Sequence, residues 1–413
     1  MYLLVSGKLN KTLKIMNLKE YIKHKENQLT KVSNIRIDDN YKATTYSYRT
    51  NADVDYSRIL YSSAYRRLQG KMQLFIPKSE VFYRNRLTHS HEVAQIAKTI
   101  AKKLGLKDSL TVQTCSLAHD IGNPPFGHAG ELFLTSCSST PYEGNAQTFR
   151  ILRNVEERHY DFNGLNLTIR TMLGVVKYLN TFEENKKKFL YDSDYNIVKN
   201  WLDEYKIEHK TIDCEIMDIA DEIAYAVHDL EDALKLKYFT IDELLHEFDI
   251  SSEYKEMSQT FKKIIVIAKN FAEKATVYKT SEEYSMLFRK ELTSKLVHTF
   301  IGDIGLIEGE KIGYQKLEKL AKGLKKLTFE AIKRQPDIIE YEQLGKYVLT
   351  KLYTLYNDEE FNRDLVLLPA NYRSMKNKTS MILDYLGGMT DNYAIQQYEK
   401  YYGSLKDKGI YFK

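Results

Sequence analysis

Apolar positions recur at three- and four-residue intervals in several segments of the chain, the spacing that places side chains on one face of a helix. One such segment runs from Thr88 to Leu104 and is followed by Gly105, a residue type that often ends helices. A second helix is expected from about Ser109 to His119, and residues 145–180 also predict helix. Another strongly amphipathic segment runs from Cys214 to Leu236. The apolar faces comprise Val93, Ile96, Ala97, Ile100 and Leu104 in the first segment, and Ile216, Ile219, Ala220, Ile223, Val227 and Leu230 in the last.

The stretches between these segments differ in character. Residues 121–130, IGNPPFGHAG, contain two Pro and three Gly, so the chain must leave the helix there. Residues 181–210 are polar and rich in lysine and predict a surface excursion, whereas residues 240–365 predict several charged helices. The pattern as a whole predicts an all-α fold.

The chain divides into three parts. Residues 1–15 are a candidate extension or a mis-assigned start, because Met16 opens a second plausible start. Residues 16–235 contain the clearest helical pattern and form the predicted core, and residues 236–413 supply additional C-terminal helices.

Composition narrows the class of protein. Only 19 Gly and 6 Pro in 413 residues favour long helices over many short strands. The net charge of +5 is too mild to be a nucleic-acid footprint by itself. The three cysteines form no CxxC pair, so no disulfide framework or cysteine zinc site is indicated. No apolar run reaches the ~18–20 residues of a membrane span, and we expect a soluble cytoplasmic protein.

His89 is the first candidate for metal chemistry. It lies four residues before Val93, so its side chain faces the buried side of the predicted helix. A lone histidine at such a position is more often a core residue than a ligand. His91, two positions on, falls on the polar face and is interpreted as a surface residue.

Two further segments carry residues of the same chemistry. His119 and Asp120 end an apolar helix just before the Pro/Gly loop, where an imidazole and a carboxylate can converge on one divalent cation. Asp221 forms a polar stripe with Tyr225 and Asp229, which on most helices is a solvated face. The tyrosine and the apolar neighbours of Asp221 favour a ligand instead.

Taken together, the order H…HD…D resembles the HD-domain metal phosphohydrolases. Among them the chain is similar to the deoxyguanosinetriphosphate triphosphohydrolase (dGTPase) family, which implies an HD-domain helical fold with additional C-terminal helices. The departures are His91, where the family usually has an apolar residue, and Gly144-Asn145-Ala146, a trio that is more polar or bulkier in relatives. The resemblance rests on the stretches RRLQGKMQLF (66–75), RNRLTHSHEVAQIAKTIA (84–101), LAHDIGNPPFGHAGE (117–131), YEGNAQTFRIL (142–152), GLNLTIRTMLGVVKY (164–178), DIADEIAYAVHDLEDA (218–233) and LDYLGGMTDNYA (383–394).

This resemblance implies hydrolysis of a deoxynucleoside triphosphate (dNTP), with dGTP among the substrates, to the deoxynucleoside and intact inorganic triphosphate. A divalent cation would stabilise charge developing on the α-phosphate. Mn²⁺ or Mg²⁺ is expected, with Ni²⁺, Fe²⁺ and Zn²⁺ as alternatives. The implied ligands are His89, His119, Asp120 and Asp221.

Proton transfer is assigned to His128, nine residues after His119, with Glu131 orienting its ring. In the family the matching pair has this catalytic part. The alternative is that both residues cap the next helix.

Basic and polar side chains must surround the triphosphate. Arg86 lies one helical turn before His89, and Asn123 lies in the Pro/Gly loop. Lys177 and Tyr178 match a family segment near the phosphates. Arg373 is a further phosphate candidate, for which an unpaired surface arginine is the alternative.

The resemblance also assigns the sugar-facing residues. Gln73 and Asp229 match positions that read the 3′-hydroxyl, and Tyr225 matches one that stacks against the sugar. A ring packed where a 2′-hydroxyl would sit would reject ribonucleotides. Asn145, in the divergent trio, is a substrate-binding candidate that could alter substrate choice.

Other functions stay open at this point. A 5′-deoxynucleotidase, an alarmone hydrolase or another HD hydrolase would need only the metal ligands, and a binding protein could have kept the fold without activity. The resemblance implies a homo-oligomer, dimer-based or hexameric, in which the C-terminal part completes the site and supplies contacts. A dNTP effector and weak binding of single-stranded nucleic acid are further expectations, and no membrane partner is expected.

Overall fold

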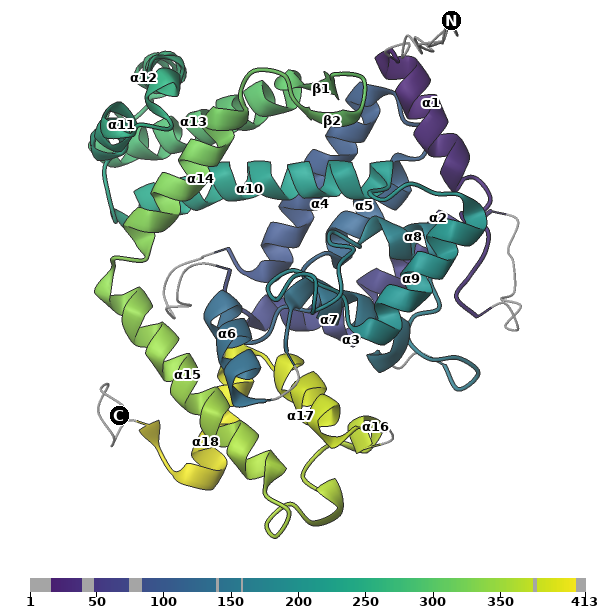
Figure 1. Ribbon diagram of the computed structural model, residues 1–413. Helices are drawn as coiled ribbons and strands as arrows, with labels where there is room; N and C mark the ends of the chain where they lie inside the picture. Colours follow the sequence, from purple (N-terminus) through teal and green to yellow (C-terminus); the bar gives the residue numbers. More distant parts are fainter. Residues whose placement is uncertain are drawn as a thin grey trace, which may run out of the picture.

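The computed structural model confirms the predicted all-α class, because the chain it describes is helical apart from one two-stranded sheet (Figure 1). All candidate site residues lie in the described part, whereas the expected extension, residues 1–15, lies outside it. The described residues are 16–38, 48–73, 84–138, 141–156, 159–373 and 377–405.

Three mutually packed helices form the centre of the molecule (Figure 1). They are α4 (Arg86–Leu104), α5 (Ser109–Ala118) and α10 (Ile212–Leu236), close to the segments predicted from apolar spacing. Each begins after a capping residue whose side chain accepts a backbone N–H of the first turn; the caps are Asn85, Asp108 and Thr211. Gly105 ends α4 in the left-handed conformation, with a φ of 83°. The predicted inner faces of α4 and α10 are buried except for Ile219, which is partly exposed.

The prediction of helix throughout residues 145–180 is wrong. Helix stops after Val155, and a loop follows in which Gly164 and Asn166 adopt positive φ angles of 62° and 45°. Helix resumes only at Ile169, where the Thr168 side chain caps the new start. Residues 181–210 are also not a mere surface excursion, because they include an amphipathic helix. The other elements of this half are α1 (Leu18–Leu29), α2 (Asn51–Leu60), α3 (Ser63–Arg67), η1 (Leu68–Gly70), α6 (Gly127–Cys137), α7 (Gly144–Arg150), η2 (Ile151–Val155), α8 (Ile169–Gly174) and α9 (Asp192–Tyr205).

The C-terminal part is helical as predicted but also contains a short hairpin that the sequence did not indicate. Strands β1 (Ile304–Ile307) and β2 (Lys311–Tyr314) pair antiparallel with Ile304 opposite Tyr314. The remaining elements are α11 (Ile241–Ile250), η3 (Lys255–Met257), α12 (Ser258–Ala275), α13 (Ser281–Asp303), α14 (Glu318–Ile332), α15 (Pro336–Asn357), η4 (Arg363–Leu365), α16 (Ala370–Arg373), α17 (Lys378–Gly387) and α18 (Asp391–Tyr402).

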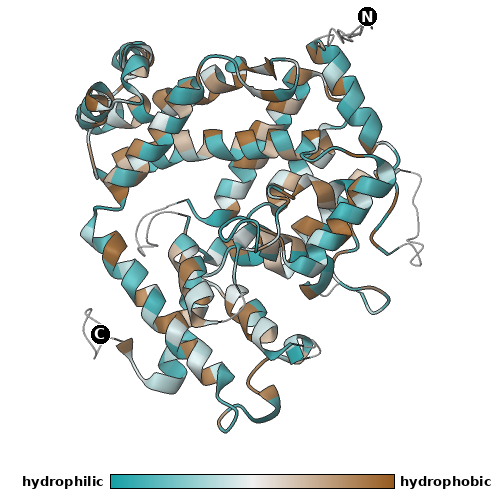
Figure 2. Cartoon of the chain, in the orientation of Figure 1, coloured by the Kyte–Doolittle hydropathy of each residue, from teal (hydrophilic) through white to brown (hydrophobic). Residues whose placement is uncertain are grey.

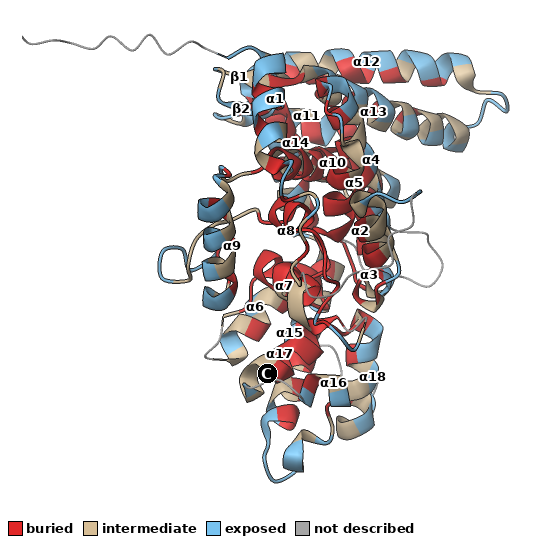
Figure 3. Ribbon diagram, turned by 90° about the vertical axis from the view of Figure 1, so that its right-hand side faces the viewer, coloured by how far each residue is buried: buried red, intermediate tan, exposed pale blue. Residues whose placement is uncertain are grey.

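Burial follows the layering of the helices. Figure 3 shows buried residues concentrated along α4, α5, α8 and α10, with α9, α12 and α18 carrying exposed faces. Hydrophobic and hydrophilic residues alternate along the helices (Figure 2), as amphipathic packing requires. Among the described residues, none of the helices combines the length and the apolar character needed to cross a membrane.

The lower part of Figure 1 contains α15, α16, α17 and α18 together with α6. Helix α15 packs against α6, which directly follows the Pro/Gly loop, and also against α17 and α18. Residues 336–402 therefore lie beside the loop that carries several candidate site residues.

Candidate active site

The four predicted metal-binding residues come together at the centre of the three-helix packing. His89 lies in the first turns of α4, His119 caps the end of α5 with Asp120 next to it, and Asp221 projects from α10. Each of the four residues is 1–7% exposed. Because α4, α5 and α10 pack on one another, residues more than 100 positions apart face one point.

The distances in this cluster fit a small cation. The ligand atoms of His89, His119 and Asp120 lie within 4.8 Å of one another, a group that could hold a metal ion. One oxygen of Asp221, Oδ1, is 3.1 Å from His89 Nε2 and 3.2 Å from His119 Nε2. Two imidazole nitrogens and two carboxylates form the nitrogen–oxygen donor set that suits divalent first-row metals or Mg²⁺.

The ring of His119 is oriented by its own helix. Its Nδ1 lies 2.7 Å from the carbonyl oxygen of Ser116, one helical turn earlier. Nδ1 therefore donates its hydrogen to that carbonyl, which leaves the lone pair of Nε2 facing the cluster. Nε2 is buried without a hydrogen-bond partner in the described chain, as a metal-binding nitrogen would be before it meets its ion.

Asp120 is held from two sides. Arg86 Nη1 lies 2.7 Å from its Oδ2, and Asn123 Nδ2 donates to its Oδ1 at 2.7 Å. Burial opposes the charge of Asp120, but nearby His119 and Arg86 outweigh that effect and lower its pKa. The carboxylate that the cluster needs is thus kept ionised.

Asp221 has a comparable partner in Lys177, whose Nζ lies 2.6 Å from its Oδ2. Burial works against the ionised form, but the Lys177 ammonium and the two histidines hold its pKa well below the usual range. Lys177 also lies 3.2 Å from Asp218 Oδ1, so it is shared between two carboxylates. An anionic substrate requires a cationic side chain of this kind beside the candidate metal ligands.

The loop after Asp120 is shaped by close backbone approaches. A side chain on Gly122 would meet the backbone of Gly144 and Thr148, so only glycine fits there. Tyr142 donates its hydroxyl hydrogen to the carbonyl of Gly122 at 2.8 Å. Phe126 has a φ of 62°, the left-handed region that side chains rarely adopt, directly before α6 begins.

The predicted proton-transfer pair lies at the start of α6. The side chain of His128 is 70% exposed, and its Nδ1 lies 3.8 Å from Glu131 Oε2. This separation allows ion pairing but exceeds a hydrogen bond. The side chain of Glu131 is 12% exposed and lies near the loop, since its Oε2 is 3.6 Å from the Cβ position of Gly144.

Of the predicted sugar-facing residues, Tyr225 contacts the cluster, and Gln73 and Asp229 are buried. The Tyr225 ring lies 4.8 Å from that of His89, with Lys325 Nζ 4.9 Å from the Tyr225 ring centroid. Both amide atoms of Gln73, a 6% exposed residue, have no hydrogen-bond partner in the described chain. Asp229 is 7% exposed, and burial together with the Asp232 carboxylate raises its pKa well above the usual value. Buried polar groups without partners are typical of positions that wait for a ligand.

The side-chain amide of Asn145 forms hydrogen bonds to the backbone with both of its ends. Its amide nitrogen donates to the carbonyl of Val175 at 2.7 Å, and its oxygen accepts the N–H of Lys177 at 3.0 Å. Both ends of the amide are therefore used to fix the backbone that carries Lys177 and Tyr178.

One cation beside this group was missed by sequence reasoning. Lys188 Nζ lies 3.2 Å from Glu143 Oε1 and 5.2 Å from the centroid of the Tyr178 ring. The sequence offered no signal for it, because Lys188 ends a run of three lysines, and the two lysines before it are exposed. Only the fold of residues 175–190 selects this lysine.

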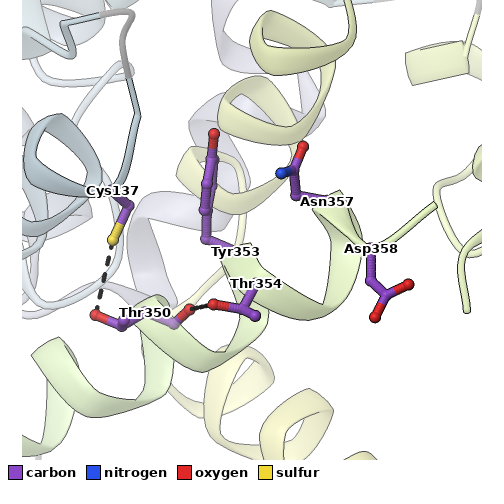
Figure 4. A pocket seen from close by; sticks show the side chains of 6 residues that line it. All are labelled: Cys137, Thr350, Tyr353, Thr354, Asn357 and Asp358. Atoms are coloured by element: carbon purple, nitrogen blue, oxygen red, sulfur yellow. Dashed lines mark hydrogen bonds between the residues drawn. The ribbon is translucent and has the colours of Figure 1, made fainter. Parts of the chain in front are cut away.

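Arg373 stands apart from the other candidates. It is exposed on α16, and no hydrogen bond or ion pair in the described chain joins it to the cluster. A separate cavity of about 380 Å³ lies between the end of α6 and α15, where Cys137 Sγ is 3.7 Å from Thr350 Oγ1 (Figure 4). No candidate site residue lines it. The cavity is bordered by Cys137, Thr350, Tyr353, Thr354, Asn357 and Asp358.

Comparison with known proteins places these observations in context. The HD domain model matches residues 86–226, a span that contains all four candidate metal ligands, and the phosphohydrolase-associated domain model matches residues 314–400. The chain is 48% identical to deoxyguanosinetriphosphate triphosphohydrolase-like protein 2 of Vibrio cholerae over 400 residues, which are 95% of this chain and 98% of that protein. It is 32% and 31% identical to the deoxyguanosinetriphosphate triphosphohydrolase-like proteins of Rickettsia felis and Rickettsia bellii, covering 87% of this chain and 94% of each relative.

Proposed function

Because this chain belongs to the deoxyguanosinetriphosphate triphosphohydrolase-like family of HD-domain proteins, we propose that it hydrolyses dNTPs to deoxynucleoside and inorganic triphosphate. We include dGTP among the substrates. The supporting observation is the convergence of His89, His119, Asp120 and Asp221. The Nε2 atom of His119, which has no hydrogen-bond partner in the described part of the chain, lies 3.2 Å from Asp221 Oδ1. We assign these four residues to one Mn²⁺ or Mg²⁺ ion.

When bound, that cation supplies Lewis-acid stabilisation of charge on the α-phosphate. The residues around it do the positioning. Arg86 and Lys177 each hold one carboxylate of the cluster and present the remaining donors of their cationic groups to the phosphates. Lys188 adds a third cation, and Asn145 fixes the backbone that precedes Tyr178.

We assign proton transfer to His128. Glu131 lies on the Nδ1 side of its ring, which leaves Nε2 to exchange a proton with the reacting oxygens as water attacks phosphorus and the bond to the 5′-oxygen breaks. The high exposure of His128 fits a group that exchanges protons with solvent between turnovers.

We assign deoxyribose selection to Gln73, Asp229 and Tyr225. The buried amide of Gln73, which has no hydrogen-bond partner among the described residues, and the carboxyl group of Asp229 would read the 3′-hydroxyl, and the Tyr225 ring would occupy the space of a 2′-hydroxyl. These features favour a triphosphohydrolase over a 5′-deoxynucleotidase or an alarmone hydrolase, which need the metal ligands but not this combination of sugar contacts and three cations.

The experiment is a product analysis. The purified full chain is incubated with each dNTP and Mn²⁺ or Mg²⁺, and the products are separated by ion-exchange chromatography. Inorganic triphosphate with deoxynucleoside is the expected result. Orthophosphate or pyrophosphate without triphosphate would refute the reaction and favour the alternatives.

A variant tests the assignment of roles. His128→Ala should keep its metal content while turnover falls by about 10²–10⁴-fold, the usual contribution of a general acid or base. Loss of metal from this variant would instead make His128 a ligand.

A further inference from the structure

A buried carboxylate of the C-terminal part is bonded to two backbone amides beside the candidate active site. Asp391, 1% exposed at the start of α18, accepts the N–H of Met72 and the N–H of Phe126, each at 2.9 Å. Met72 directly precedes Gln73, and Phe126 lies two residues before His128. One side chain therefore joins the two segments that carry proposed sugar-reading and proton-transfer groups.

Phe126 needs such support because of its backbone. Its left-handed conformation, with φ 62° and ψ 21°, is one that residues with a Cβ adopt rarely and hold only when the surroundings fix it. Helix α15 supplies the other support. The Tyr341 ring lies 5.4 Å from that of Phe126, and its hydroxyl donates to Asp391 at 3.2 Å. Gly345 lies against Phe126, where an added Cβ would be 2.5 Å from the ring carbon Cγ.

A second connection runs through Lys71. This residue is 2% exposed, and its side-chain nitrogen donates to the carbonyls of Asn123 and Gly387, the latter at 2.8 Å. Asn123 belongs to the Pro/Gly loop and Gly387 to the end of α17. The loop is thus bonded to the C-terminal part at both Asn123 and Phe126.

The hydrogen bonds of Asp391 and Lys71 to the loop go to backbone atoms, and none of them involves a candidate metal ligand. We propose that Asp391 is a positioning residue, which fixes the loop carrying His128 relative to Gln73 and thereby sets the geometry for catalysis without touching substrate. The role rests on the proposed function. It gives residues 336–402 a task in the reaction beyond packing.

The same part of the chain offers a matched control. Asp384, 2% exposed on α17, accepts from Gln147 and bidentately from Arg150, but makes no bond to the loop. Asp384→Asn therefore weakens an equally buried contact between the C-terminal part and the core, but at a place away from the loop.

The test compares Asp391→Asn with Asp384→Asn in the full chain. An asparagine oxygen can keep one amide partner, but its NH₂ group cannot accept the other. Asp391→Asn is expected to lower kcat by about 10- to 100-fold, as misplacement by about 1 Å can do, while Mn²⁺ affinity measured by direct titration stays near that of wild type. Hydrogen exchange of peptides covering residues 121–128 should be faster. Asp384→Asn should leave kcat and the exchange of this loop close to wild type.

A second variant acts from the other side. Gly345→Ala places a methyl group against Phe126 without removing a hydrogen bond, and should reproduce faster loop exchange and lower kcat with Mn²⁺ affinity retained. If Asp391→Asn does not fold, the Gly345→Ala variant tests the proposal in its place.

The proposal is overturned if loop exchange in Asp391→Asn and Gly345→Ala equals that of wild type, if the loop loosens while kcat is kept, or if Asp384→Asn loses as much kcat. A wild-type chain that releases no triphosphate would refute the proposed function instead, because the exchange data measure the bond between Asp391 and the loop independently of turnover.

Discussion

The buried pair of Arg86 and Asp120 allows the stability of the site and its metal affinity to be measured separately. The two side chains are 5% and 10% exposed and meet at 2.7 Å, and Arg86 Nε has no hydrogen-bond partner in the described chain. Asp120→Asn therefore leaves a buried guanidinium without its counter-charge. Removing one member of a buried pair costs about 3–5 kcal/mol. For a chain of 413 residues, with an unfolding entropy of about 0.9 kcal/mol/K, Tm should fall by about 3–6 °C.

The double variant Arg86→Met/Asp120→Asn isolates the cause. It removes the stranded charge, and a buried pair replaced by neutral groups is often near neutral in stability, so at least about 2 kcal/mol should be recovered. The response to metal should not recover. Mn²⁺ at about 100 times its Kd should stabilise wild type by about 2.7 kcal/mol, or about 3 °C in Tm, whereas both variants lack the carboxylate that we propose as a ligand and should show little shift.

Calorimetric unfolding with EDTA or Mn²⁺ measures both effects. If the double variant is no more stable than Asp120→Asn, the stranded charge of Arg86 is not the source of the loss. If Asp120→Asn keeps the wild-type shift with Mn²⁺, Asp120 is not a ligand.

Three further predictions concern other parts of the site. Tyr225→Ala should raise kcat/KM for ribonucleotides relative to deoxyribonucleotides by about tenfold, because it removes the ring that we propose excludes a 2′-hydroxyl; an unchanged ratio in steady-state assays would place that discrimination elsewhere. Burial and Asp232 raise the pKa of Asp229, so the folded chain holds this proton more tightly than the unfolded chain, and the stability that the group contributes falls as pH rises above about 4. Asp229→Asn should therefore raise Tm at about pH 7.5 and approach the wild-type value near pH 4, and a Tm difference that does not change between these pH values contradicts the cause. Gly122→Ala should cost about 1–3 kcal/mol in denaturant unfolding and lower turnover, because its methyl group meets backbone atoms of Gly144 and Thr148; wild-type stability would mean that the loop can move aside.

The spacing of apolar residues was sufficient to predict features that depend on a single helix, such as its bounds and the direction of its side chains. Apolar spacing placed α4, α5 and α10 within two residues of their observed bounds, and helical phase turned His89 inward and His91 outward. The phase was insufficient for residues 145–180, where Gly164 and Asn166 take positive φ angles inside a stretch whose composition still favours helix. Such an interruption is set by packing against the rest of the fold, which local propensity does not contain.

Long-range contacts required the tertiary structure. Asn145 was a substrate candidate by sequence, yet both ends of its amide bind backbone at Val175 and Lys177. Lys188 could not be distinguished from its neighbouring lysines until its ammonium group was seen to lie beside Glu143. Neither fact is encoded in any short window of residues, because each depends on where a distant segment lies.

By itself the sequence determined that this is a helical protein with two histidines and two aspartates in an order suited to a metal, because helix periodicity and residue chemistry are local properties. The tertiary structure decided that Nε2 of His119 lies 3.2 Å from Asp221 Oδ1, and that Asp391, more than 250 positions later in the sequence than either residue, joins Met72 to Phe126. The physical reason is the same in both cases. A buried polar atom takes its role from the partners that packing brings within hydrogen-bond distance, and those partners come from other helices.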